Sequence, residues 1–467
     1  MLIMKSVIRF ATGFCLLFTL AGCLPDRVFW SPDGSVAAII TGDQNDGHLI
    51  FCDADGVTLD SGLDGIAHLE WLPEGRGILV GINRTWDQWS QIDAELLDFE
   101  RARVAELIER ISAGTGSEHG VVDWINAQRE SKALGPNQLL IVSHYLADHP
   151  DITLPAQVAA ALPPKEPVEG VQLVEFEVNG MQLGERSELG FVTEPVWAIR
   201  PSPHGDLALL VYGQAFNQSS MPLKLALLSL GRDGAPVQGR ILSPNSAFYP
   251  DWARDGNSIV FAEADFITSD HQPFSLGKIR EAEVFNKEGV LQWEPPMTDH
   301  AIILMSEQTC IRTLSDGQIL FSGPEGQFPS GVKDGIRRLG LFSLDPERRP
   351  TVSSMLAYET SMEIGNFGWT FEVNPEERRV ALVAEDGRVA IVTLADGSVD
   401  FTQPEADTDS NLLTLPKWRA QGDLCLCLPL PETTGNGAEA ELVLYRDGNK
   451  QSLSANWPES WIKGFLD

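Results

Sequence analysis

The densest group of side chains that could bind a metal comprises His144, Asp148, His149 and Asp151. Imidazole nitrogens and carboxylate oxygens are common zinc ligands. Two histidines that share a metal from a single helix stand four positions apart, as in the H-E-x-x-H motif. His144 and His149 are five positions apart, and the chain contains no H-E-x-x-H. We therefore expect no metal site here.

Motifs for nucleophilic catalysis, calcium binding and redox chemistry are incomplete. Ser117, in the stretch GTGSEHG, lacks the G-x-S-x-G spacing of a hydrolase nucleophile. Residues 53–56, DADG, match half of a calcium loop without its distal glutamate, so a hairpin turn fits better. Cys425 and Cys427 are two positions apart, on one face of an expected strand, and are expected to be buried free thiols. The sequence names no catalytic residue, metal or cofactor and favours a protein that is not an enzyme.

The N-terminal residues have the pattern of an export signal. Lys5 and Arg9 precede an apolar run, residues 10–20, which is shorter than the roughly 20 residues that span a bilayer. Small residues then lead to Cys23. We expect a signal peptide over residues 1–22 and a mature chain over residues 23–467.

The stretch Leu20-Ala21-Gly22-Cys23 resembles the lipobox of bacterial lipoproteins. The resemblance implies a diacylglycerol on the Cys23 thiol and attachment of the protein to a membrane of the cell envelope. Leu24 is not the aspartate that retains enteric lipoproteins at the inner membrane, which favours the outer membrane, on its periplasmic or surface side. An ordinary signal peptide with a chance cysteine is the alternative.

The charge of the chain limits its partners. Its formal net charge is −32, with 66 acidic and 34 basic residues. A chain this acidic repels phosphate backbones, so we expect no nucleic-acid partner. It is also unsuited to lying flat on anionic lipid. The expected membrane contact is therefore the lipid on Cys23.

One turn motif recurs along the chain, beginning with WSPDG at Trp30. Each copy has a polar turn followed by an apolar run of strand-forming residues. The turn positions are Gly34, Gly75, Gly205, Gly256, Gly317, Glu377 and Gly422. Apart from one gap of about 130 residues, the spacings of about 41–61 residues suit one four-stranded propeller blade.

The WSPDG repeat resembles the TolB-type, WD40-like β-propellers of bacterial envelopes. The fold expected is all-β, a propeller with seven four-stranded blades, although six or eight remain open. We expect a structural role for the motif, in which an acidic residue such as Asp33 accepts turn N–H groups and glycine permits positive φ. The tryptophans are expected to pack between neighbouring blades. The residues assigned to this role are Trp30, Asp33, Gly34, Trp71, Gly75, Trp252, Gly256 and Trp418.

The long gap predicts a mainly helical insertion, residues 85–167, within the second blade. Val104, Leu107, Ile108 and Ile111 follow helical periodicity, although residues 95–108 could instead form a hairpin. Trp86, Trp89 and Trp124 are candidate recognition residues because loops on rigid scaffolds often carry specificity. The alternative is that these side chains attach the helices to the ring.

These observations favour a lipid-anchored β-propeller of the cell envelope that acts as a non-catalytic scaffold and binds an envelope protein or a ligand. The alternative is an envelope enzyme that acts on glycan or peptide at the mouth of the channel. A third possibility is a purely structural surface protein.

Overall fold

The computed structural model describes residues 26–42, 46–112, 118–130, 136–213, 223–232, 235–264, 275–305, 308–324, 339–345, 352–356, 370–383, 389–402, 414–430, 439–446 and 449–463. The expected signal peptide, residues 1–22, and Cys23 lie outside these residues. Within them, no helix is both long and apolar enough to cross a membrane.

The first sheet contains two antiparallel groups of four strands that share one long strand. Residues 58–66 of β4 pair with β3, and residues 66–71 pair with β5. In sheet order the strands are β1 (Val28–Trp30), β2 (Val36–Thr41), β3 (Gly47–Asp53), β4 (Thr58–Trp71), β5 (Gly77–Trp86), β6 (Val168–Asn179) and β7 (Gln182–Val192). A short 3-10 turn, η1 (Pro73–Gly75), joins β4 to β5.

The second sheet also joins two such groups, and a single residue pair, Ser246 with Glu263, links them. The first group is β8 (Val196–Pro201), β9 (Leu207–Tyr212), β10 (Leu223–Ser229) and β11 (Gly239–Ser246). The second is β12 (Asp251–Trp252), β13 (Ser258–Ala264), β14 (Ser275–Glu283) and β15 (Met297–Met305).

Three separate four-stranded antiparallel sheets follow. They are β16 (Ile311–Thr313), β17 (Ile319–Pro324), β18 (Leu339–Leu344) and β19 (Val352–Leu356); β20 (Phe371–Val373), β21 (Arg379–Val383), β22 (Val389–Thr393) and β23 (Val399–Phe401); and β24 (Lys417–Trp418), β25 (Leu424–Leu430), β26 (Glu439–Arg446) and β27 (Asn449–Ser452). A short helix, α7 (Glu459–Lys463), packs beside β26.

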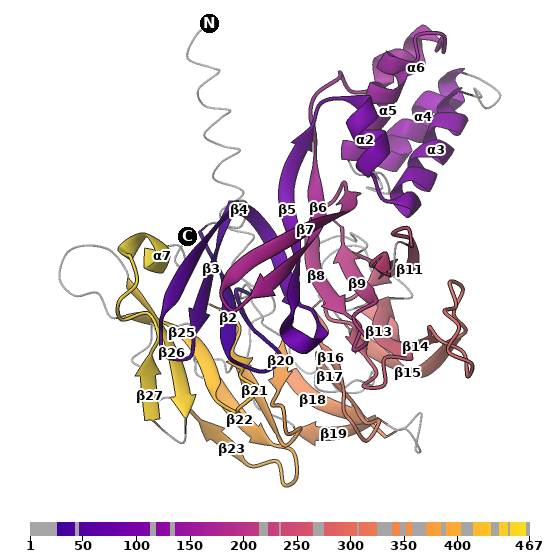
Figure 1. The fold of residues 1–467 in the computed structure, drawn as a ribbon. Helices are drawn as coiled ribbons and strands as arrows, with labels where there is room; N and C mark the ends of the chain where they lie inside the picture. Colours follow the sequence, from indigo (N-terminus) through magenta and orange to yellow (C-terminus); the bar gives the residue numbers. More distant parts are fainter. Residues whose placement is uncertain are drawn as a thin grey trace, which may run out of the picture.

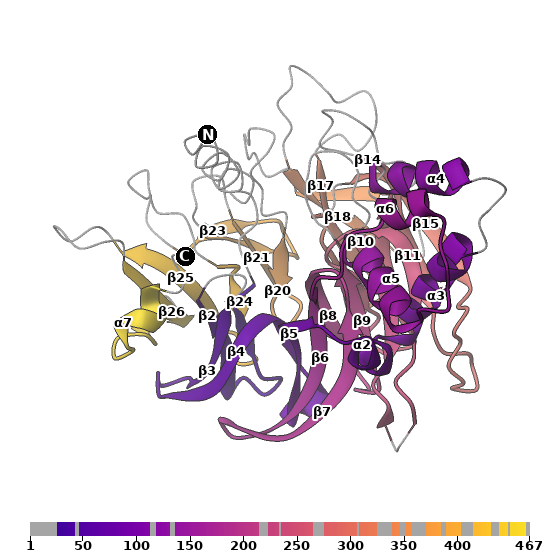
Figure 2. The same cartoon turned by 90° about the horizontal axis from the view of Figure 1, so that it is seen from above.

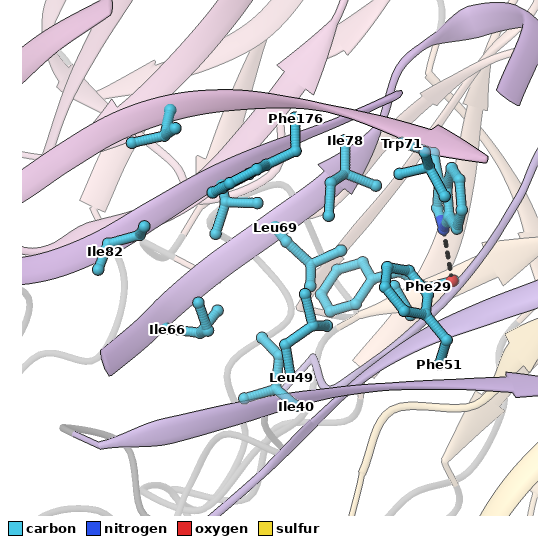
Figure 3. Packing of buried hydrophobic residues seen from close by; sticks show 14 of the residues in the cluster. Phe29, Ile40, Leu49, Phe51, Ile66, Leu69, Trp71, Ile78, Ile82 and Phe176 are labelled. Carbon is cyan, nitrogen blue, oxygen red and sulfur yellow. Dashed lines mark hydrogen bonds between the residues drawn. The ribbon is translucent and has the colours of Figure 1, made fainter. Parts of the chain in front are cut away.

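Hydrophobic clusters hold each four-stranded group against the next. Figure 3 shows the cluster between the first two groups, where Phe29 and Phe51 face Leu69 and Ile78. Equivalent clusters follow at each later junction, and the last joins β25 and β26 to β1, β2 and β3. The described chain is thus mostly β, and its sheets follow one another around a centre as in a propeller (Figure 1).

Helices occupy the chain between β5 and β6. They are α2 (Trp89–Glu95), α3 (Asp98–Ser112), α4 (Glu118–Glu130), α5 (Pro136–Asp148) and α6 (Ala156–Ala161). We call residues 89–161 the helical segment. Its helices share a core of their own and gather on one side of the ring of sheets (Figure 2). Thr85 and Trp86, inside the range expected for the insertion, belong to β5 because they pair with β6.

Candidate functional site

The first strand of six of the seven four-stranded groups supplies a charged residue at one repeated position. We call these strands the inner strands: β1, residues 66–71 of β4, β8, β12, β16, β20 and β24. The repeated position immediately precedes the aromatic position of the turn motif. It holds Phe29, Glu70, Arg200, Asp251, Arg312, Glu372 and Lys417. We call the six charged residues, together with Asp26 just before β1, the charge ring.

Ion pairs connect the charge ring from one sheet to the next. An Arg200 Nη1–Glu70 Oε2 distance of 3.1 Å joins the second and third groups, and an Arg312 Nη2–Glu372 Oε1 distance of 3.4 Å joins two later ones. Lys417 Nζ lies 2.8 Å from Glu372 Oε1 and 2.8 Å from Asp26 Oδ2. Arg200 lies close enough to Glu372 and Asp26, as well as to its neighbour Glu70, for all three carboxylates to raise its pKa. The ring therefore converges at the centre of the sheets.

The signs of the charges alternate from Glu70 to Lys417. An odd number of positions cannot alternate all the way around, and the neutral position is Phe29, whose ring centroid lies 5.8 Å from Lys417 Nζ. Asp26 supplies the carboxylate that Lys417 needs on that side. Opposite charges placed side by side lower the cost of removing each from water.

Burial and the neighbouring charges of the ring shift the pKa values of its carboxyl groups. Burial opposes ionisation of Glu372, but Lys417, Arg312 and Arg200 outweigh it and lower its pKa from 4.5 to about 2. Burial raises the pKa of Glu70 in spite of Arg200. Burial likewise raises the pKa of Asp251, although Arg312 and a 2.8 Å hydrogen bond from the Thr313 amide oppose it. Glu372 is therefore the most firmly ionised of these carboxyl groups.

His68 lies beside the ring and is neutral at physiological pH. Burial, Arg200 and Lys417 lower its pKa from 6.5 to about 3. Its ring packs edge-on against Phe29, with centroids 5.4 Å apart. Among the described residues, His68 Nε2, Asp26 Oδ1 and Arg200 Nε are buried without a hydrogen-bond partner. Buried polar atoms of this kind ordinarily bind ordered water.

The arrangement is suited to holding charges in place rather than to transferring protons. The cationic side chains of the ring face carboxylates, and the adjacent Cys310 is fully buried with its pKa raised by that burial. A nucleophilic cysteine needs a lowered pKa and access to solvent. Among the described residues, no group of histidine, cysteine and acidic side chains is placed to hold a metal ion.

Three of the motif tryptophans bond to the neighbouring inner strand. The indole N–H groups of Trp71, Trp252 and Trp418 donate to the backbone oxygens of Phe29, Arg200 and Glu372, at 2.7, 2.8 and 3.1 Å. Each bond therefore crosses to the preceding four-stranded group. At Trp30 the Arg419 guanidinium lies over the ring, 5.4 Å from its centroid.

The turns that follow the inner strands meet on one face, which we call the turn face. Asp33 accepts the Ser35 amide at 3.0 Å, and Gly34 has a φ of 67°. Neighbouring turns touch, because Gly75 lies against Pro32 and Gly256 against His204.

Side chains also join the turns to one another. Gln421 donates to the Asp33 carbonyl at 2.7 Å, and Glu377 accepts hydrogen bonds from Arg254 and Ser315 of two other turns. The turn face is therefore a continuous, mostly polar surface.

The three candidate recognition tryptophans lie among packed side chains. Trp86 is buried, stacks on Phe191 with centroids 3.9 Å apart, and donates to Glu95 at 2.9 Å. Trp89 is half-buried against Tyr145, and Trp124 is half-buried under the Arg110 guanidinium. These contacts attach the helices to the ring and to one another.

The two histidines considered as metal ligands have different hydrogen-bond partners. His144 is buried and bonds through Nε2 to the Glu166 carbonyl, whereas His149 bonds through Nδ1 to the Tyr145 carbonyl. In the DADG stretch, Asp53 accepts the amides of Asp55 and Val57, both at 2.9 Å, as a hairpin turn requires.

The charge ring is the feature that reasoning from sequence missed. Its signal is a column of alternating charges one residue before the motif aromatic, visible once the copies are aligned on their turn glycines. An alignment that considers only the turn residues does not reveal this column of charges.

Comparisons with known proteins concern the fold alone. No protein-family model matches the chain, and no curated protein matches its sequence. The structure is similar to that of a putative TolB from Agrobacterium tumefaciens, with 13% identity, 58% of this chain and 84% of that chain covered, and a TM-score of 0.35. It is also similar to a puromycin hydrolase, with 13% identity, 94% and 55% of the two chains covered, and a TM-score of 0.46.

A puromycin-hydrolyzing peptidase from Mycobacterium tuberculosis is similar at 9% identity, with 92% of this chain and 56% of that chain covered and a TM-score of 0.42. The chain thus spans little more than half the length of these two proteins.

Proposed function

We propose that the protein is a seven-bladed β-propeller, attached through a lipid on Cys23 to a membrane of the bacterial envelope, that acts as a non-catalytic scaffold for an envelope protein. The four-stranded groups and the clusters between them support the blade count. The lipobox at Leu20–Cys23 supports the anchor. The helical segment between β5 and β6 forms part of the second blade.

The observation that carries the scaffold role is the mutual pairing within the charge ring. Glu70, Arg200, Arg312, Glu372 and Lys417 each have an oppositely charged partner within the ring. Catalysis by an acid or base needs a group that can exchange a proton with substrate. Cations and carboxylates that are paired with one another instead stabilise the centre of the sheets, which favours binding over an enzyme at the channel mouth.

The turn face is the surface best placed for the partner. It lies at the opposite ends of the inner strands from the start of the chain, so an anchor at Cys23 leaves it free. Its turns are tied together by side-chain hydrogen bonds, and Glu74 and Arg76 on it are 71% and 87% exposed. A rigid surface loses little entropy on binding.

Capture of partners from detergent-solubilised membranes tests the scaffold role. Glu74→Lys combined with Arg76→Glu reverses these two exposed charges of the turn face without touching the core. Asp123→Lys, on the exposed surface of α4, is the matched control. We expect the double variant to lose a partner that the wild type and the control retain. Retention of every partner by the double variant would exclude this face.

Fractionation tests the anchor separately. We expect Cys23→Ser to move the protein from the membrane fraction to the soluble fraction without changing its melting temperature. The lipobox motivates this expectation, because the described residues contain no helix that could span a membrane. Retention of the variant in the membrane after a high-salt wash would contradict lipid anchoring.

A further inference from the structure

The helical segment leaves the ring on the face from which the chain begins. Pro32 lies against Gly75, so the turns after β1 and β4 are neighbours, and the indole of Trp71 bonds to Phe29 of β1. The two inner strands therefore run in the same direction and begin at the same end. β5 runs back from the turn face and reaches that end at Ile82, which pairs with Ile66. We call this the start face.

A lipid on Cys23 would hold the start face close to the bilayer. Asp26 is fixed at the centre of the ring by Lys417, at 2.8 Å. Two residues, Leu24 and Pro25, separate it from Cys23. Even a fully extended chain spans only about 3.5 Å per residue, so Cys23 lies within about 10 Å of Asp26.

The helical segment extends farther than that tether allows. Beyond Ile82, β5 continues paired with β6 to Trp86, four residues or about 13 Å farther at 3.3 Å per residue. The helices begin only there, and the longest of them, α3, has 15 residues and a length of about 22 Å. Figure 1 shows α2–α6 standing beyond the ends of the sheets. A ring lying flat on the bilayer would therefore drive the helices into it.

The composition of the helical segment excludes that insertion. Acidic side chains outnumber basic ones along residues 89–161, and no described helix is apolar enough to span. Burial of unpaired carboxylates in hydrocarbon is costly. The ring must then tilt about its anchor until the helical segment lies along the surface of the bilayer.

We propose that the helical segment is the membrane-facing element of the protein and rests on lipid headgroups beside the acylated Cys23, holding the propeller tilted. The inference depends on the lipid anchor of the proposed function. The segment offers a half-buried aromatic group suited to the headgroup region, in which Tyr145 stacks on His149 at 4.1 Å and Trp89 packs edge-on at 5.1 Å. Its acidity favours zwitterionic over anionic lipid.

Fluorescence quenching by spin-labelled lipid tests this orientation. The full-length acylated protein is reconstituted in phosphatidylcholine vesicles, with one fluorophore on a cysteine introduced by Glu106→Cys, Asp123→Cys or Asp148→Cys. These exposed positions lie on α3, α4 and α5. Glu74→Cys on the turn face is the control, and the described native cysteines are buried.

We expect headgroup-labelled lipid to quench at least one helical position at least twice as strongly as position 74, and anionic phosphatidylglycerol to weaken the effect. Equal or stronger quenching at position 74 would overturn the inference, as would no quenching on acylated, vesicle-bound protein. Protection of the helical positions only in native membranes would overturn it in favour of a protein partner. Absence of the acyl group by mass spectrometry would instead defeat the anchor, and the orientation with it.

Discussion

The indole of Trp252 shows how one side chain of the repeat joins two neighbouring four-stranded groups. It is 6% exposed, packs in the cluster between its own strands and the preceding group, and donates to the Arg200 carbonyl at 2.8 Å. We expect Trp252→Ala to lower the free energy of unfolding by about 3–5 kcal/mol, as large aromatic truncations do. Trp252→Phe, which keeps a ring and loses the N–H, should cost less than half as much. Urea unfolding measures both, and a loss below about 1 kcal/mol for alanine would contradict the inter-blade role.

Glu372 makes stability depend on pH in a window set by its lowered pKa. Its pKa falls from 4.5 to about 2, so its ionised form favours the folded state above 4.5 and that contribution is lost as the pH falls toward 2. The shift corresponds to a contribution of up to about 3 kcal/mol. We expect the cost of Glu372→Gln to be largest near pH 6 and to shrink steadily between pH 4.5 and 2.5.

Glu70 and Asp251 have raised pKa values, so ionisation of these two groups disfavours the folded state. They are present in both the wild type and the variant, so the difference between the two proteins at each pH isolates the contribution of Glu372. Glu74→Gln, at an exposed position of the turn face, is the control. Chemical unfolding at a series of pH values gives the differences. A cost of Glu372→Gln that is constant with pH would show that the ring does not set the charge of this residue.

At the scale of elements, the helical segment joins the ring through a buried carboxylate. Glu100 of α3 is fully buried, and it accepts hydrogen bonds from Tyr212 Oη at 2.8 Å and Thr193 Oγ1 at 3.2 Å. Removal of either partner leaves a buried polar group unpaired, at a cost of about 1–3 kcal/mol. We expect Glu100→Ala and Tyr212→Phe to be coupled by at least about 1 kcal/mol in a double-mutant cycle. Additive effects on unfolding would contradict a direct contribution of this bond.

The elements themselves were largely predictable because their signals are local. Polar turns followed by apolar runs predict hairpins, and the described chain is mostly strand. The spacing of Val104, Leu107 and Ile111 predicts a helix, and α3 covers Asp98–Ser112 with all three side chains buried. The contact of the Arg110 guanidinium with the ring of Trp124, in α4, could not be predicted from that periodicity, because it depends on how the two helices pack.

The charge ring was not predictable in the same way because its partners are distant in the chain. Asp26 and Lys417 are 391 positions apart, and their contact exists only because the last blade returns to the first. Each charge, taken alone, looks like an ordinary polar residue beside a turn. Only the fixed position of the repeat within every blade brings these residues to one centre, and a turn motif does not show which side chains face inward.

At the scale of the whole molecule, the ring closes without a strand shared between its ends. Strands β1–β4 come from the start of the chain and β24–β27 from its end, and in the described residues no backbone ladder joins them. Side chains join these two sheets at a junction that we call the seam. Lys417 pairs with Asp26, and Gln421 donates a hydrogen bond to the Asp33 carbonyl. A hydrophobic cluster at the seam includes the thiols of Cys52, Cys425 and Cys427. The other described cysteine, Cys310, lies between β16–β18 and β20–β22.

These cysteines report where the ring opens. In the described residues neither a backbone ladder nor the chain itself crosses the seam, whereas the chain passes directly from β16–β19 to β20–β23, the two sheets beside Cys310. The seam should therefore separate at a lower free-energy cost than global unfolding. We expect Cys52, Cys425 and Cys427 to react with a thiol reagent before Cys310 in sub-denaturing urea, because all four are buried in the closed ring. Asp26→Asn, which removes one carboxylate of the seam, should accelerate labelling of the three and leave Cys310 unchanged, with Glu74→Gln as the control. Mass spectrometry of the labelled peptides gives each rate. Simultaneous labelling of all four, at the rate of global unfolding, would mean that the blades separate only together and that side chains close the seam as firmly as the other junctions.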